Sequence, residues 1–248
     1  MSTLARRLAA EGLGTALLVA AVVGSGIHAR NLAGDNTALA LLANSLASGG
    51  ALVALLLALE PVSGGHLNPA VSLSALVRGA LSARDALCYA LLQLGGGIAG
   101  VMAAHAMFGA PLLAWSTQAR TGAPMWWSEF VATFGLIGVA MGTARSRPAL
   151  VPLVVAAYIM AGYWFTASSA FANPALTLAC ALTAGFSGIR AADVPAFVLA
   201  QLAGALSATL VFDWLCAASA RHPAPGTAPG ATSSTARHMA ARPVTSSD

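Results

Sequence analysis

The sequence predicts an all-α membrane protein with six spanning helices and two re-entrant half-helices, arranged as an inverted repeat. Composition is the first reason, because 58% of the residues are hydrophobic and only 8% are charged, whereas soluble domains carry roughly 25% charged residues. Length is the second, because several apolar runs reach about 20 residues, enough to cross a bilayer. The third is a tripeptide, Asn-Pro-Ala, that occurs once in each half of the chain.

The apolar runs divide the 248-residue chain into one membrane domain and a tail. Pro61 is expected to end the second span, because proline cannot continue a helix. The tail is rich in Ala, Pro, Ser and Thr, which predicts a disordered cytoplasmic segment. We therefore expect one membrane domain over 1–218, with repeats at about 4–108 and 126–218, and a tail over 219–248. The expected spans are 4–27, 37–59, 86–108, 126–144, 149–166 and 194–218.

Each tripeptide is expected to start a short helix. Asn68 and Asn173 are good N-caps, because their side chains accept hydrogen bonds from the first helical turn. A proline follows each asparagine and suits the first helical position. The apolar stretches that follow, about 70–79 and 175–185, are too short to cross a bilayer. They are therefore predicted to be half-helices that begin at the motifs Asn68-Pro69-Ala70 and Asn173-Pro174-Ala175.

The two halves of the chain resemble each other. Glu11 in the first span has a counterpart in Glu129 of the fourth, and Gln93 in the third has one in Gln201 of the sixth. Each half thus contains a span with Glu, a span, a half-helix and a span with Gln. Because three full spans is an odd number, the second half enters from the opposite side, which makes this an inverted repeat.

Arginine placement predicts the orientation. All twelve basic residues are Arg, and they lie mainly at the ends of apolar runs, which marks topology rather than nucleic-acid binding. Arg30, Arg120 and Arg190 fall on one side of the predicted membrane, and the other nine fall on the opposite side. The arginine-rich side is normally cytoplasmic. We therefore expect a multi-pass protein of the inner (plasma) membrane with both termini in the cytoplasm.

This geometry indicates a pore. The half-helices dip in from opposite faces, so Asn68 and Asn173 are expected to meet near the midplane. Each helix N-terminus carries about half a positive charge, and two such ends facing one spot oppose cations. The asparagine amides add N–H donors for a neutral solute. The expected cargo is therefore small and uncharged.

The motifs also resemble a known family. The segment Ser63–Val71 and the segment Phe171–Ala175 are similar to the two signatures of the aquaporin (major intrinsic protein) family. The resemblance implies a six-span bundle with two half-helices, and a passive channel for water and small neutral solutes. It also implies a homotetramer in membrane lipid with one pore per subunit. An enzyme, a cofactor and a nucleic-acid partner are not expected.

The family's selectivity filter departs from its usual form here. Counting the family's offsets from the two asparagines places the filter at Ser48, Ala161, Ala170 and Leu176. Water channels of the family carry an aromatic residue at the first position, and nearly all members carry Arg at the last. A wide filter without arginine is therefore expected, open to glycerol-like polyols as well as water.

The segment Gly162–Ser168 resembles a bacterial subgroup in which the filter arginine is replaced, and some of its members are associated with arsenic resistance. This makes neutral hydroxides such as undissociated arsenite candidate cargo. The aromatic residues Tyr163, Trp164 and Phe165 could instead narrow the pore, and the offsets leave this open.

The ionisable residues within the spans have two interpretations. Glu11 and Glu129 are expected to be structural carboxylates that accept backbone N–H groups, although a coupled secondary transporter would use such groups in its pathway. The transporter remains the alternative, since it too can have inverted repeats and broken helices. His66 is expected either to line the cytoplasmic vestibule or to brace its loop. No catalytic residue or metal-ligand cluster is indicated.

Overall fold

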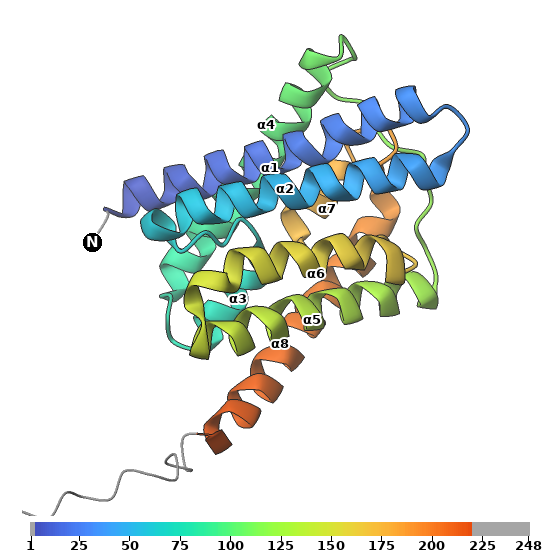
Figure 1. Ribbon diagram of the computed structural model, residues 1–248. Coiled ribbons are helices and arrows are strands. Elements are labelled where there is room, and N and C mark those ends of the chain that lie inside the picture. The colour runs from blue at the N-terminus through green and yellow to red at the C-terminus, as the bar shows by residue number, and fades with distance from the viewer. Residues whose placement is uncertain (1–2, 220–248) are drawn as a thin grey trace, which may run out of the picture.

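The computed structural model describes residues 3–219, and helices dominate that range (Figure 1). Six helical segments are long and apolar enough to cross a membrane, which agrees with the predicted fold class. The helices are α1 (Leu4–Ala33), α2 (Thr37–Ser63), α3 (Pro69–Val77), α4 (Ala83–Met107), α5 (Ala123–Ser146), the 3₁₀ turn η1 (Pro148–Leu150), α6 (Val151–Phe165), α7 (Pro174–Cys180), η2 (Ala191–Asp193) and α8 (Val194–Ser219).

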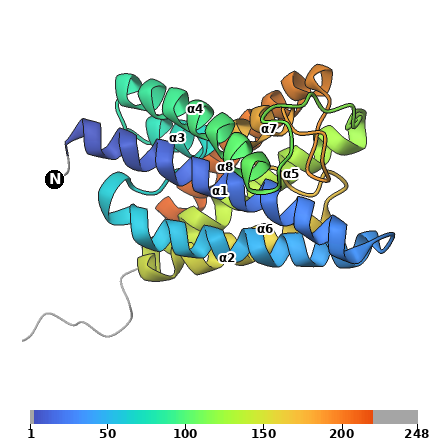
Figure 2. The same cartoon turned by 90° about the horizontal axis from the view of Figure 1, so that it is seen from above.

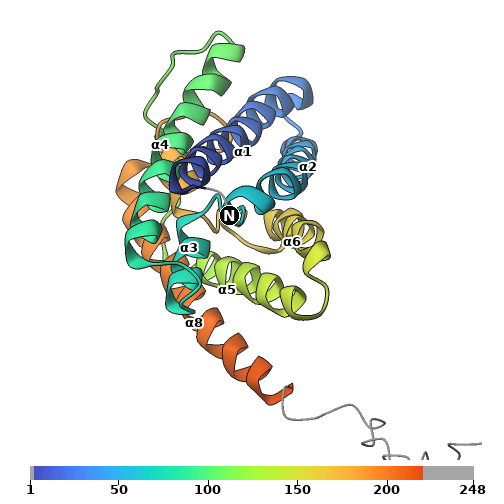
Figure 3. The same cartoon turned by 90° about the vertical axis from the view of Figure 1, so that its left-hand side faces the viewer.

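The two halves of the chain form matching units, and the short helix of each half also packs against a long helix of the other half. In the first half α1 packs on α2 and α4, and in the second half α5 packs on α6 and α8. Figure 2 shows α1 and α2 running alongside each other. The short helix α3 also packs on α8 of the other half, and α7 packs on α4 of the first. Figure 3 shows the long helices arranged around the region where α3 begins.

Three predicted boundaries were wrong. Helix α1 was expected to end at residue 27 but continues to Ala33, so only residues 34–36 separate it from α2. Helix α2 runs through Pro61 to Ser63, because the N–H of Gly64 still bonds to the carbonyl of Glu60 at 2.9 Å and closes the last turn. Helix α7 ends at Cys180 rather than near 185. The carbonyls of residues 180–182 accept from Ile189, Ser116 and Ala114 instead of continuing the helical ladder. The stretch after α7 is thereby tied to the α4–α5 connection.

Burial follows the pattern of a membrane protein. Glu11 and Glu129 are fully buried, while many leucines on the long helices are exposed. Exposed Leu13, Leu91 and Leu210 would be unfavourable in water, but they suit a hydrocarbon environment. The predicted tail, 219–248, lies outside the described residues except for Ser219, with which α8 ends.

Close backbone contact between α1 and α4 depends on glycine. A Cβ atom on Gly96 would collide with the carbonyl oxygen of Gly12. The equivalent pair in the second half is α5 and α8, where a Cβ on Gly204 would lie 2.5 Å from the carbonyl oxygen of Phe130. Small residues permit this approach in lipid, where van der Waals packing replaces the hydrophobic effect between helices.

This contact predicts that Gly96→Ala destabilises the fold while Gly95→Ala does not. A Cβ at Gly96 must push α1 away from α4, and such overpacking costs about 1–3 kcal/mol. A Cβ at the adjacent Gly95 meets nothing within 4 Å, so this variant is the matched control. Thermal unfolding in detergent should show a lower midpoint only for Gly96→Ala, and equal midpoints would contradict the close contact.

Candidate functional site

The two half-helices begin in the same way. Asn68 precedes α3 in an extended conformation, and its Oδ1 accepts from the N–H of Ala70 at 2.9 Å. Asn173 precedes α7 likewise, and its Oδ1 accepts from Ala175 at 2.9 Å and Leu176 at 3.3 Å. Each cap uses only the side-chain oxygen. The amide Nδ2 groups are therefore directed away from their own helices.

These amide nitrogens link the two halves. Nδ2 of Asn68 donates to the carbonyl of Ala172 at 2.8 Å, and Nδ2 of Asn173 donates to the carbonyl of Leu67 at 2.9 Å. Each NH₂ group has two N–H donors, so one on each asparagine remains for another acceptor. Both asparagines line a cavity described below, and a solute oxygen passing there can accept from both.

The loops that approach the half-helices have unusual backbone geometry. Leu67, Ala170 and Ala172 adopt positive φ angles of 49°, 49° and 47°, and Ser169 adopts 63°. Such angles cost non-glycine residues of order 1–3 kcal/mol each and persist only where their surroundings fix them. Here the carbonyls of Leu67 and Ala172 are the acceptors for the two asparagines. The strained geometry thus directs these carbonyls toward the opposite half-helix.

Glu11 fixes the first loop. Its Oε1 accepts from the Ser63 hydroxyl at 2.6 Å and from the N–H of His66 at 2.9 Å. Its Oε2 accepts from the N–H of Leu67 and from Nε2 of Gln93, both at 2.7 Å. The carboxylate thereby satisfies backbone donors that no secondary structure serves. Glu11 is absent from the walls of both cavities described below.

Glu129 does the same for the second loop. Its two oxygens accept from the N–H groups of Phe171 and Ala172, each at 2.9 Å. Gln201 donates to Oε2 at 2.6 Å and also reaches the hydroxyl of Thr177 at 2.8 Å. The Glu and Gln that recur in the sequence therefore have the same structural role in both halves, which is to hold the loop before the half-helix.

Two cavities pass through the centre of the bundle. The narrow cavity, of about 160 Å³, runs from Glu60 and His66 past Asn68 and Asn173. The wide cavity, of about 420 Å³, begins at the start of α2 and at the α4–α5 connection. Five residues line both cavities, so the cavities adjoin there. We call this ring the waist; it consists of Val22, Tyr163, Ala170, Phe171 and Leu176.

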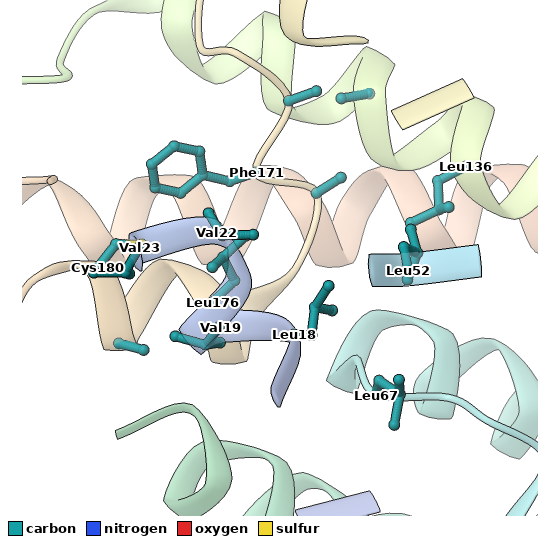
Figure 4. Packing of buried hydrophobic residues seen from close by; sticks show 14 of the residues in the cluster. Leu18, Val19, Val22, Val23, Leu52, Leu67, Leu136, Phe171, Leu176 and Cys180 are labelled. Carbon is teal, nitrogen blue, oxygen red and sulfur yellow. The ribbon is translucent and has the colours of Figure 1, made fainter. Parts of the chain in front are cut away.

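The walls of the narrow cavity are mainly apolar. Leu18, Leu52 and Leu136 line it and also belong to the main buried cluster. Figure 4 shows Val22 and Leu176 in the same part of this cluster as Phe171, with Leu52 and Leu136 farther along. A solute therefore meets few polar groups between His66 and the waist, and the two asparagines supply N–H donors along that path.

The residues expected in the filter are only partly brought together. Ala170 and Leu176 are in the waist, and Ser48 lines the narrow cavity beside it. Ala161 is exposed and lines neither cavity, so its assignment needs correction. The cavity face of α6 carries Val155, Ile159 and Tyr163, at the four-residue spacing of one helix face. Ala161 points away from that face.

Tyr163 takes the place expected for Ala161. Its ring lines both cavities, and its hydroxyl donates to Oγ of Ser48 at 3.1 Å. Trp164 and Phe165 are 49% and 54% exposed. Trp164 borders only the wide cavity, and Phe165 borders neither. Of the three aromatic residues left open by the sequence, Tyr163 is therefore the one that belongs to the waist.

His66 lies at the far end of the narrow cavity. Its Nδ1 is 3.0 Å from the hydroxyl oxygen of Ser72. Its ring packs edge to face with the ring of Tyr89, with 5.3 Å between the ring centroids. The two expectations for His66 are compatible, since the ring lines the cavity while its nitrogen and its ring face fix the loop.

The sequence analysis did not identify the charged residue that lies next to the waist. Arg120, from the α4–α5 connection, lines the wide cavity and is only 8% exposed. No local motif marks it, and the only sequence signal is that it is one of three arginines on its side of the predicted membrane. Over residues 3–219 no group of three His, Cys, Asp or Glu side chains is placed to hold a metal ion.

Comparisons with known proteins agree with this architecture. The model of the family described as major intrinsic protein matches residues 1–165 and 149–244. The chain is 51% identical to aquaglyceroporin AqpS of Rhizobium meliloti (strain 1021), over 86% of this chain and 91% of that protein. It is 34% identical to aquaporin TIP1-2 of Zea mays, over 84% of this chain and 85% of that protein.

The fold has a counterpart among solved structures. The aquaglyceroporin from Plasmodium falciparum superimposes with a TM-score of 0.67, over 88% of this chain and 98% of that chain, at 20% identity. At that identity the likeness concerns the fold alone. The match of the family model to both halves and the 51% identity to AqpS, together with the six membrane-length helices and the paired Asn-Pro-Ala half-helices, show that the chain is an integral membrane protein of the major intrinsic protein family.

Proposed function

We propose that the chain is a passive channel for water and for larger neutral solutes, with glycerol-like polyols as the substrate class. The observation that carries this proposal is the waist, which has two aromatic rings (Tyr163 and Phe171), three aliphatic side chains and no charged side chain of its own. The name of the relative AqpS, an aquaglyceroporin, supports the same substrate class.

The chemistry of the path suits neutral hydroxylated molecules. Each asparagine keeps one amide N–H for a solute oxygen, and the apolar wall accommodates a carbon skeleton. The positive ends of α3 and α7 disfavour cations near the two asparagines. Undissociated arsenite is a small neutral hydroxide and belongs to the cargo we propose, on the strength of the resemblance of Gly162–Ser168 alone.

A coupled transporter is the alternative, and the structure favours the channel. Glu11 and Glu129 are the carboxylates that a proton-coupled mechanism would use, yet their oxygens are occupied by loop N–H groups and amides. Neither lines either of the two cavities described above. Counterflow in proteoliposomes with and without a proton gradient separates the two mechanisms, and accumulation driven by the gradient would contradict the channel.

We also propose a cellular location and an oligomeric state for the protein. The similarity to the bacterial protein AqpS supports a plasma-membrane location, and the arginine distribution supports cytoplasmic termini. The narrow cavity then opens to the cytoplasm at His66, and the wide cavity opens outward. The family resemblance supports a homotetramer with one pore per subunit.

Solute range is the first test. Stopped-flow light scattering of proteoliposomes is expected to show protein-dependent permeation of water, glycerol, urea and arsenous acid. Protein-free liposomes of the same lipid are the control. Permeation of water alone would contradict a waist wide enough for polyols.

The role of Tyr163 gives a second prediction. Tyr163→Ala removes the ring that lines both cavities, so glycerol permeation should rise, by roughly three- to tenfold, more than water permeation. Phe165→Ala is the matched control, because Phe165 lines neither cavity. An equal response of the two variants in stopped-flow assays would place the constriction elsewhere.

Leu176 gives a third prediction. Leu176→Arg adds a long cationic side chain at the waist, so glycerol permeation should fall about tenfold while water permeation is largely kept. Leu176→Met is the control, because methionine is uncharged and close to leucine in volume, and this variant should resemble the wild type. If Leu176→Arg has the solute profile of the wild type, Leu176 is not in the constriction.

A further inference from the structure

Arg120 is held rigidly although it lies in a connection between helices. Its backbone N–H donates to Oδ2 of Asp193 at 2.9 Å. Its Nε donates to the carbonyl of Gly188 at 2.8 Å, and its Nη1 donates to the carbonyl of Ser168 at 3.0 Å. The guanidinium carbon lies 4.8 Å from the centroid of the Phe171 ring, within the range of a cation–π contact.

The connection that carries Arg120 is itself fixed. Ala114 and Ser116 donate to the carbonyls of Leu182 and Ala181, each at 3.0 Å, and the carbonyl of Gln118 accepts from Arg190 at 2.7 Å. The connection therefore lies along the segment after α7, and the position of the Arg120 side chain is set by both.

The guanidinium adjoins the waist. Phe171, beneath it, is a member of the waist, and Ser168, its hydrogen-bond partner, precedes Ala170 by two residues. Arg120 lines the wide cavity together with Tyr163, Ala170 and Leu176. A solute moving between the cavities therefore passes both the waist and Arg120.

The positive charge of Arg120 is not cancelled by a partner. Within residues 3–219 the ion pairs are Arg7–Asp85, Arg78–Asp213 and Arg190–Asp193, and none includes Arg120. The carboxylate of Asp193 accepts from the backbone N–H of Arg120, but its ion pair is with the side chain of Arg190. Burial lowers the pKa of Arg120, with Cys180, Glu129 and Tyr163 as the other titratable groups near it, and a guanidinium stays charged at neutral pH.

The guanidinium also has donors to spare. It carries five N–H groups, and two of them have partners among the described residues. Three thus remain for a solute oxygen in the wide cavity. An arginine at position 176 would have supplied a positive charge and free N–H donors, but position 176 is leucine. Arg120 supplies both.

We propose that Arg120, carried by the α4–α5 connection, is the specificity-determining cation of this pore and replaces the arginine missing from the waist. It repels cations in the wide cavity beside the waist and offers N–H groups to neutral solutes. This inference rests on the channel function proposed above.

The test compares urea with guanidinium, two molecules of the same shape that differ in charge. Tracer uptake into proteoliposomes containing the full chain should show urea entry and guanidinium exclusion for the wild type. In Arg120→Met, guanidinium uptake should rise about tenfold relative to urea, because a full charge beside the path is removed. Arg30→Met, which removes an exposed arginine at the end of α1, is the matched control and should keep the exclusion.

Two more variants keep the test decisive even if Arg120→Met folds poorly. Arg120→Met/Leu176→Arg returns a guanidinium to the waist and should restore exclusion. Arg120→Lys should exclude guanidinium at pH 7 and lose this exclusion as the pH rises through the pKa of the amine, whereas the wild type should not change.

The outcomes separate the two proposals. If the wild type passes neither urea nor glycerol, the channel function and this inference both fail. If the wild type passes urea and Arg120→Met still excludes guanidinium as the wild type does, only the role of Arg120 is overturned. A pH-independent exclusion in Arg120→Lys would overturn it as well.

Discussion

Two buried carboxylates make the irregular centre of this protein possible. Backbone N–H groups at membrane depth have no water to bind, and each one left unsatisfied costs several kcal/mol. Glu11 and Glu129 accept these groups at the start of each half-helix and are themselves bound by Gln93 and Gln201. Without them the loops could not keep the positive φ angles that direct the carbonyls of Leu67 and Ala172 toward the two asparagines. The cavities and the waist are assembled around these loops.

The pore combines a mostly apolar wall with a few fixed polar points. Leu18, Leu52 and Leu136 form both core and wall, so packing and permeation share the same side chains. Polar contact comes at the asparagines and, in the wide cavity, at Arg120. Because all of these groups are held by other parts of the chain, the path is preorganised rather than formed by the solute. Such a path can discriminate by size at Tyr163 and by charge at Arg120 at separate positions.

The sequence was sufficient for the architecture because that architecture rests on local signals. Apolar length predicted the spans, and the paired Asn-Pro caps predicted the half-helices. The main errors were at three helix ends: α1 continued to Ala33, α2 kept a last turn closed by Gly64, and residues 180–182 found partners outside α7. The residues of the waist were harder to predict from the sequence. Ala161 was placed by counting from Asn173, but the turn of α6 puts Tyr163 on the cavity face. Arg120 was missed because its position depends on contacts with Ser168 and Gly188, far away in sequence.

The reciprocal bonds between the two half-helices bear on how the protein is made. Asn68 needs the carbonyl of Ala172, and the carbonyl of Leu67 needs Asn173. During synthesis the first half enters the membrane before the second exists, so its loop has an unsatisfied donor and acceptor until roughly a hundred more residues follow. The centre of the channel is therefore completed late. A chain truncated after the first half would have the full set of three spanning helices and still lack a pore.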